Sequence, residues 1–459
     1  MQNTGKLFLF RVDKYVVKTS KEQKAKLDTA VGRYLFSQNV AFSGVENPHF
    51  VKLCSSLRPG YQPPNRKQIA GPILDQVYGE IQTSMNSEIS KSKSVLVLSQ
   101  DGWSSVMNNP IIAHSLFVGG KSYLYSLENC GSNSKTAEYC FNLTDNIIGR
   151  LKDELGKDVG GIVTDNEAKM RQFRAKVDEK YPDILTYGCS AHYMNLLENA
   201  VTDPDKRVMK HVVEVSKHFR NVHKSLGMLR ERGGLTPQLP NDTRWTSQII
   251  CLEVFLKNHD KYAEIRDELY DRGDNTIPVN VGRIIDDRQL KRLAGDWLDM
   301  SKCFAVALDR LQSDNCSVGE SIHIWLNLMK NEKLQQFQDE IKRRFDQYRE
   351  PFMVIAYMMD PRYQEEWPEF LANEFSYLED EADEWLDNKD TNGEMMEPYI
   401  KFKSKEKDSQ LYPGYLFKLS TTSSPAEWWS FVDDRNSRSK KISSEFTRLM
   451  IRKIIASLK

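Results

Sequence analysis

The order of apolar runs between Ser94 and Val201 constrains the fold of this chain more than any other feature. Three short runs rich in β-branched and aromatic residues come first, at Ser94–Ser99, Ile111–Val118 and Ser122–Leu127. They have the length of strands, and the glycines between the second and third runs favour a hairpin. A helical pattern then alternates with two further strand-like runs.

The second half of this stretch predicts parallel strands joined by helices. Apolar residues recur at helical spacing between Lys135 and Leu155, and the run "GIVT" ends at Thr164. A helix pattern begins near Glu167, followed by a short strand at Leu185–Gly188 and a helix at Ala191–Val201. Three antiparallel strands followed by two parallel ones, with helices packed on the sheet, predict an α/β fold with a ribonuclease-H-like core.

The remainder of the chain has mainly helical patterns. At roughly 100–200 residues per domain, 459 residues predict more than one structural unit. We expect a helical N-terminal region at 1–90, the core at 91–204, a large all-α insertion at 205–410, and a C-terminal helix within 411–459 that completes the core. Inside the insertion, the acidic stretch 378–394 predicts a solvated loop.

Composition and charge exclude several classes of protein. Lys plus Arg and Asp plus Glu both number 64, so no overall field attracts the chain to nucleic acid or to a membrane. Any nucleic-acid contact must therefore come from a local patch. No apolar run approaches the ~20 residues that span a bilayer, and we find no signal-peptide pattern. The seven scattered cysteines are typical of free thiols in the cytosol or nucleus.

Two aspartates follow strand-like runs whose ends are expected to meet. Asp101 comes after the first run in "LSQDGW", and Asp165 comes directly after "GIVT". In a ribonuclease-H-like sheet these strands are neighbours, so both carboxylates would offer oxygen ligands to Mg²⁺ or Mn²⁺ at one edge. A local role is the alternative for each residue. Asp101-Gly102 is a common turn pair, and Asp165 is placed to cap the following helix.

Six motifs in order give the chain a family resemblance. They are "LSQDGWSS", "GIVTDNEAKM", "YGCSAHYMNLLENAV", "DTRWTSQ", "AYMMDPRY" and "AEWWSF". Together they resemble the hobo/Activator/Tam3 (hAT) superfamily of cut-and-paste DNA transposases. The resemblance implies a ribonuclease-H-like core interrupted by a helical insertion, and metal-dependent DNA cleavage and strand transfer in the nucleus. It places the first two catalytic aspartates at Asp101 and Asp165.

The resemblance also assigns roles outside the aspartate pair. The motif from Cys189 to His192 implies that His192 contacts the scissile phosphate, with a packed core histidine as the alternative. A zinc site would need further ligands, and the sequence offers no second pair. Trp245 matches a family tryptophan thought to stack on a flipped base, beside Arg244 as a phosphate contact. A buried tryptophan that begins a core helix is the alternative for Trp245.

A local basic segment follows the predicted core. We take Lys210, Lys217, Arg220 and Lys224 as candidate contacts to a DNA backbone. A solvated helix face is the alternative. The resemblance further implies that the region around Trp428-Trp429 closes the fold and supports a homo-oligomer.

Two family features are missing from the sequence. We find no cysteine and histidine set for the zinc-binding BED finger that often begins family members. The third catalytic carboxylate, a glutamate in an "S-x-x-x-E-R" segment beyond the Trp-Trp pair, is not found before Lys459, and neither Glu427 nor Glu445 matches that pattern. We therefore expect a hAT-transposase-like DNA-binding protein with impaired catalysis. The alternatives are a non-catalytic transposase-derived DNA-binding or protein-interaction protein and a simple metal nuclease.

Overall fold

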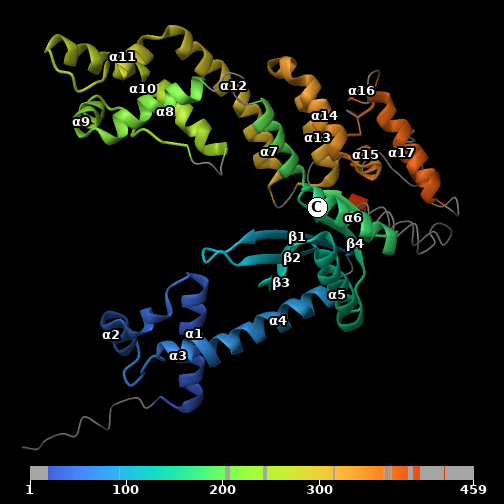
Figure 1. Cartoon of the computed structure of the whole chain (residues 1–459). Coiled ribbons are helices and arrows are strands. Elements are labelled where there is room, and N and C mark those ends of the chain that lie inside the picture. The colour runs from blue at the N-terminus through green and yellow to red at the C-terminus, as the bar shows by residue number, and fades with distance from the viewer. Residues whose placement is uncertain are drawn as a thin grey trace, which may run out of the picture. The chain divides into compact units, whose positions relative to one another are not determined.

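The chain folds into two compact units, Met1–Ser92 and Lys93–Lys459, each with its own core (Figure 1). The computed structural model describes residues 19–92, 94–201, 207–240, 245–313, 316–364, 367–370, 372, 375–390, 396–403 and 428–429.

The described part of the first unit is helical. Ser20 begins α1 (Lys21–Ser37) with a capping box, because its side chain accepts from the Gln23 N–H and the Gln23 side chain accepts from the Ser20 N–H. Helices α2 (Pro48–Leu57), α3 (Arg66–Gln68) and α4 (Leu74–Lys91) follow, with shorter turns η2 (Phe42–Glu46) and η3 (Ile69–Ile73). Their small core consists of Leu35, Val45, Ile69, Ile73 and Val77.

A mixed five-stranded sheet is the framework of the second unit. Its strands are β1 (Leu96–Ser104), β2 (Pro110–Val118), β3 (Lys121–Asn129), β4 (Val159–Thr164) and β5 (Leu185–Gly188). They lie in the order β3-β2-β1-β4-β5, in which β2 is antiparallel to β1 and β3, and β4 is parallel to β1 and β5. This is the predicted ribonuclease-H-like order, so the predicted α/β fold class is confirmed.

The turn between β2 and β3 matches the sequence prediction, whereas the length of β1 does not. Gly119 and Gly120 both have positive φ, at 55° and 82°, which glycine adopts without strain. The prediction that β1 ends at Ser99 is wrong, because its backbone pairs with β2 as far as Ser104. Pairing with a long neighbouring strand overrides the turn preference of Asp-Gly, so Asp101 lies within the strand.

Helices α5 (Ala137–Leu155) and α6 (Ala168–Lys180) pack together and follow β3 and β4 in the chain. Thr136 caps the start of α5, and Gly156 ends that helix in the left-handed conformation. The imidazole Nε2 of His114 in β2 lies 3.2 Å from the hydroxyl oxygen of Thr144 in α5. Since both side chains are fully buried, α5 covers one face of the sheet.

Helices alone follow β5 in the part of the chain that the structure describes, so the predicted all-α character of the insertion is confirmed there. None of the described helices is both long and apolar enough to cross a membrane. The helices are α7 (Ser190–Val201), α8 (Arg207–Asn221), α9 (His223–Glu231), α10 (Trp245–Asp271), α11 (Val279–Asp286), α12 (Arg288–Leu311), α13 (Val318–Met329), α14 (Gln338–Tyr348), α15 (Pro351–Met358), α16 (Trp367–Phe370), α17 (Ser376–Lys389) and α18 (Met396–Lys403), with a short turn η4 (Glu332–Phe337).

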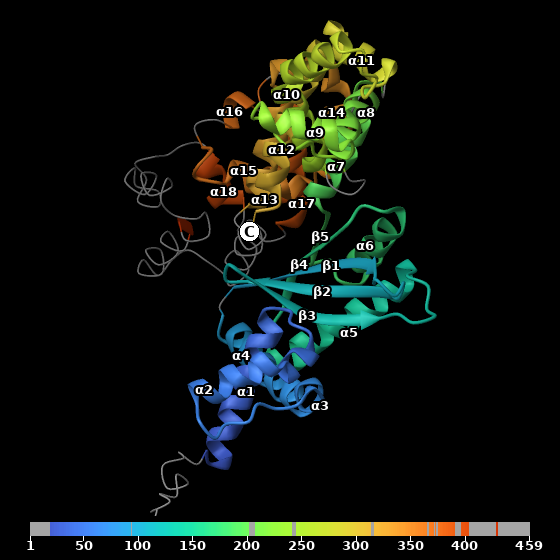
Figure 2. The same ribbon diagram turned by 90° about the vertical axis from the view of Figure 1, so that its left-hand side faces the viewer.

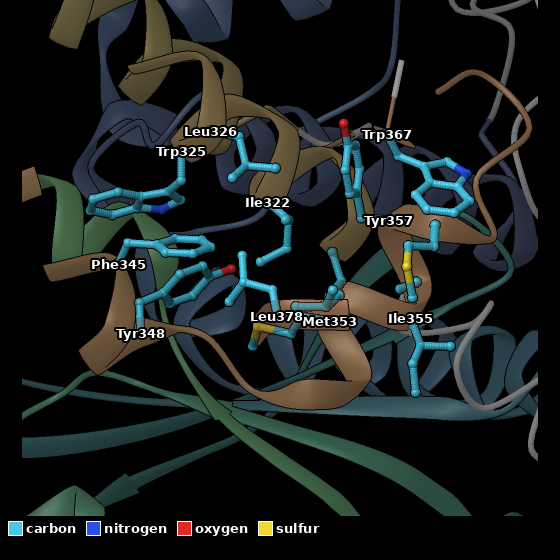
Figure 3. Close-up of a cluster of buried hydrophobic side chains, with 14 of the residues drawn as sticks. Ile322, Trp325, Leu326, Phe345, Tyr348, Met353, Ile355, Tyr357, Trp367 and Leu378 are labelled. Atoms are coloured by element: carbon cyan, nitrogen blue, oxygen red, sulfur yellow. The ribbon is translucent and has the colours of Figure 1, made fainter. Parts of the chain in front are cut away.

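Two apolar cores hold the helices of the second unit together. The first contains Phe255 and joins α8–α11 to the first half of α12. The second joins β5 and α7 to α13, α14, α15 and α17, and within it the rings of Phe345 and Tyr348 pack against Trp325 (Figure 3). Its helices lie on the side of the sheet away from α5 (Figure 2). Met300 of α12 packs against both cores, so α12 links them.

The acidic stretch near residue 380 is a helix, so the prediction of a solvated loop is wrong. Helix α17 buries Leu378, Ala382 and Leu386, which recur every four residues and pack into the second core. The acids that suggested a loop occupy the remaining faces of the helix, and Asp380, Glu381, Glu384 and Asp387 are exposed. The apolar spacing therefore determines the structure of this segment more than its charge does.

Trp428 and Trp429 belong to the second core. Both side chains are buried, and the indole N–H of Trp429 donates to the Met359 carbonyl at 3.1 Å. Phe402 of α18 contacts both rings. The two tryptophans therefore pack in the core, as expected. The rest of the predicted C-terminal helix within 411–459 lies outside the described residues.

Candidate functional site

The strand register brings Asp101 and Asp165 together. The last parallel pair between β1 and β4 is Gln100 with Thr164, and the two aspartates are the next residue on each strand. Both aspartates line the same small pocket. The two residues therefore line one pocket at this edge of the sheet, Asp101 from inside β1 and Asp165 from just past β4, while their sharing of a metal ion stays a prediction.

The pocket also contains two lysines. Its walls include Lys135, which precedes α5, and Lys169, in the first turn of α6, while Cys140, Met170 and Ile112 supply apolar surface. A cavity volume of about 20 Å³ leaves room for about one water molecule or ion. The pocket therefore combines two carboxylates and two ammonium groups around a very small space.

Asp165 has a local structural role as well as a place in the pocket. Its carboxylate accepts a hydrogen bond from the Glu167 N–H at 3.0 Å, just before α6 begins. This bond closes a turn ahead of α6 and does not cap it, because the N-cap residue is Glu167 and that helix has no side-chain cap, so the predicted capping alternative is wrong. The turn alternative for Asp101 does not apply, since Asp101 pairs with Ala113 inside the β1–β2 ladder.

Arg174 of α6 fixes the backbone that carries Asp165. Its guanidinium donates to the Thr164 hydroxyl at 2.7 Å, to the Asp165 carbonyl at 2.9 Å and to the Asn166 side-chain oxygen at 3.0 Å. Burial lowers the pKa of Arg174. Three bonds from one planar group hold the end of β4 in a single geometry. The sequence analysis missed this residue, because only the fold brings position 174 under the strand end.

The two pocket lysines are held by partners other than the aspartates. The Lys135 ammonium donates to the Trp103 carbonyl at 2.8 Å, and the Lys169 ammonium pairs with Glu167 at 2.6 Å. That hydrogen bond to Glu167 is the main reason that the pKa of Lys169 is raised, and the charge of Asp165 adds to the effect. The sequence analysis missed both lysines. The position of Lys169 four residues after Asp165, at the start of a helix, was the only available signal.

The two carboxylates that the structure describes in the pocket fit one divalent cation. Two carboxylates with water and a substrate phosphate are a common ligand set for Mg²⁺. Within the described residues, no group of three or more His, Cys, Asp or Glu side chains could hold a metal ion. Asp101 and Asp165 are therefore the residues that would hold a single hydrated Mg²⁺ or Mn²⁺.

His192 does not line the pocket. It lies in the first turn of α7 and is partly buried. The backbone N–H groups of Ala191 and His192 donate to the sulfur of Cys189, so Cys189 caps the helix. Burial raises the pKa of this thiol, and the nearby charges of Asp101 and Asp165 raise it further. Cys189 therefore has a packing and capping role, and the phosphate contact assigned to His192 stays a prediction.

The predicted basic segment forms an exposed face of α8 and α9. Lys210, Lys217, Arg220 and Lys224 are all exposed. Lys224 pairs with Asp274, and Arg220 donates to the Pro237 carbonyl at 3.3 Å. Neither Lys210 nor Lys217 forms an ion pair with another described residue, so these two charges remain available to a ligand. Arg244 lies outside the described residues, as does the side chain of Trp245, whose backbone begins α10.

Comparison with known proteins supports part of the family resemblance. Residues 64–222 match the model of a family described as a domain of unknown function (DUF659). That family is associated with hAT-type transposase-like proteins. The match includes all five strands and the candidate pocket. No curated protein matches the chain.

Proposed function

We propose that this protein is a hAT-transposase-like DNA-binding protein whose sheet carries a weakened metal-dependent phosphodiester site. The observation that carries the proposal is the juxtaposition of Asp101 and Asp165 in one pocket at the end of β4. In a ribonuclease-H-like sheet this position suits hard carboxylate ligands for Mg²⁺ or Mn²⁺. The match to a transposase-associated family supports DNA as the substrate. A protein that acts on DNA in this way would work in the nucleus.

The chemistry of the site follows from these residues. A bound divalent cation would polarise a phosphoryl oxygen and generate a nucleophile from water. Asp101 and Asp165 would hold that cation, and Arg174 would keep Asp165 in place through the Asp165 carbonyl. His192 is the proposed contact to the scissile phosphate. Lys210, Lys217, Arg220 and Lys224 on α8 and α9, with Arg244 and Trp245, are the proposed DNA contacts away from the pocket.

The activity is proposed to be weak because catalysis by two metals needs a complete ligand set. Placing charge against the transition state depends on fixed geometry. Within the described residues no third acid joins the pair. This observation favours a second candidate function, a DNA-binding protein derived from a transposase that no longer cuts.

A strand-cleavage assay tests the proposal. Purified full-length protein would be incubated with end-labelled hairpin and linear DNA in Mn²⁺, beside Asp165→Ala and the exposed control Asp153→Ala. Slow cleavage by the wild type that Asp165→Ala removes and Asp153→Ala retains would support the weakened site. DNA binding without cleavage would support the second candidate. Absence of both binding and cleavage would contradict both functions.

A further inference from the structure

Two lysines share the pocket with the aspartates, and we infer that they bind the nucleic-acid phosphate at a site that holds a single divalent cation. The inference rests on the proposed function and specifies how that site meets its substrate. Asp101 and Asp165 bring two negative charges to the pocket, and Lys135 and Lys169 bring two positive ones. Glu167, which pairs with Lys169, adds a third negative charge, so the formal charge of this group is minus one before any ligand binds.

The charges around the pocket disfavour a second metal ion. Two-metal sites place their cations about 3.5–4 Å apart, with carboxylates to neutralise both. Here only two carboxylates of the described residues line the pocket, and two ammonium groups stand in its walls. One divalent cation would bring this group to a charge of plus one, which matches the single negative charge of a phosphodiester without a second metal.

Lys135 is oriented so that it can bind a phosphate beside Asp101. Its ammonium is fixed by the bond to the Trp103 carbonyl, two residues along β1 from Asp101. A side-chain carbon added to Gly102 would lie 3.4 Å from the Lys135 nitrogen, so the glycine leaves room for this amine. An ammonium group has three N–H donors. The bond to Trp103 uses one of them and leaves two for phosphate oxygens.

Lys169 lies on the other side of the pocket, in the first turn of α6 and four residues after Asp165. Its pairing with Glu167 at 2.6 Å holds the amine beside Asp165. Within the described residues, neither pocket lysine forms an ion pair with Asp101 or Asp165. The carboxylates therefore remain available to a cation, and the lysines to an anion. The pocket thus has a cation-binding pair and an anion-binding pair.

This division of roles predicts that removing a pocket lysine changes the Mn²⁺ affinity and the DNA affinity in opposite directions. Replacing a pocket lysine by methionine keeps the apolar stem and removes a positive charge near the cation. Mn²⁺ affinity should then rise by about fivefold, the size expected for partly exposed charges. DNA affinity should fall by about tenfold, because a charge-assisted hydrogen bond to phosphate is lost. A lysine that only supported the fold would weaken both.

The experiment measures Mn²⁺ and DNA separately on the full chain. Electron paramagnetic resonance of free Mn²⁺ gives the number of ions bound and their affinity, and fluorescence anisotropy in Ca²⁺ gives the affinity for a short single-stranded DNA. The variants are Lys135→Met, Lys169→Met, and Lys135→Arg, which keeps the charge. Lys152→Met, at an exposed ion pair with Asp158, is the matched control. Thermal melting identifies any variant that fails to fold, and Lys135→Arg then decides the role of the charge.

The expected result is one Mn²⁺ per chain, tighter Mn²⁺ and weaker DNA in both methionine variants, and near wild-type values in Lys135→Arg and Lys152→Met. Two bound Mn²⁺ ions would overturn the inference while leaving the proposed function intact. A loss of both affinities in the methionine variants would also overturn it, as would unchanged DNA affinity. A wild-type protein that binds neither Mn²⁺ nor DNA would instead contradict the proposed function.

Discussion

The pocket on the sheet and the basic face of α8 are both candidate nucleic-acid contacts, and they are built in different ways. The pocket gathers four charged side chains from β1, the end of β4 and the starts of α5 and α6. Its lysines are held in place by hydrogen bonds to the protein. On α8, Lys210 and Lys217 come from one helix surface and have no ionic partner among the described residues. Fixed charges suit bond-breaking chemistry, whereas mobile exposed charges suit attraction to a DNA backbone.

The largest effect is expected when a carboxylate of the pocket is removed. Asp101→Asn and Asp165→Asn should each lower Mn²⁺-dependent cleavage by roughly 100-fold or more, because each removes a metal ligand. The double variant should be no worse than either single one, since ligands of one ion act as a unit. Initial cleavage rates of the three variants measure this. Multiplicative losses in the double variant would show that the two aspartates do not share a cation.

The next effect concerns a buried acid in α7, the helix that follows β5. Glu198 of α7 is 1% exposed, and burial raises its pKa to about 8. The folded protein therefore retains a proton that the unfolded chain releases at lower pH, so stability falls as pH rises through this window. Glu198→Gln should be more stable than the wild type by roughly 2–4 kcal/mol near pH 8, with little difference near pH 5.

Chemical denaturation across this pH range provides the measurement. Buried His114, whose pKa is lowered to about 4, affects the wild type and the variant alike on the acid side, so the difference between them at each pH reports on Glu198. Glu154→Gln is the matched control on an exposed part of α5. Equal pH profiles for Glu198→Gln and the wild type would contradict the prediction.

A smaller change in stability, this time a loss, is expected when Arg174, which supports the end of β4, is replaced. Arg174→Ala removes three hydrogen bonds and should lower the free energy of unfolding by about 2 kcal/mol. Arg174→Lys should recover only part of this, because an ammonium cannot match the planar geometry. The neighbouring exposed Arg171→Ala should change stability by less than about 0.5 kcal/mol. Urea unfolding of the three variants tests this ranking.

The aspartate pair was predictable from sequence, because strand order and one acid after each strand suffice to place them together. The pocket lysines and Arg174 were not predictable, since they meet the aspartates only through the packing of α5 and α6 on the sheet. The local preference of Asp-Gly for turns hid the true length of β1. In α17 the acids hid an apolar face of three residues, Leu378, Ala382 and Leu386.

The smallest expected effect concerns the basic face of α8. In Lys210→Met/Lys217→Met the protein loses two exposed charges that have no ionic partner among the described residues and so should not lose stability. If both contact phosphates, the slope of log affinity against log salt for duplex DNA should become shallower by about 1.8, from about 0.9 per contact. DNA affinity should fall little at high salt and most at low salt, where fewer counterions compete. The matched control is Lys152→Met, which removes an exposed lysine charge from an ion pair with Asp158, away from the proposed DNA contacts. Anisotropy titrations over a range of salt concentrations measure the slope, and the Mn²⁺ affinity of the pocket should not change. An unchanged slope would exclude α8 from the DNA interface and leave the pocket on the sheet as the remaining candidate contact of the two.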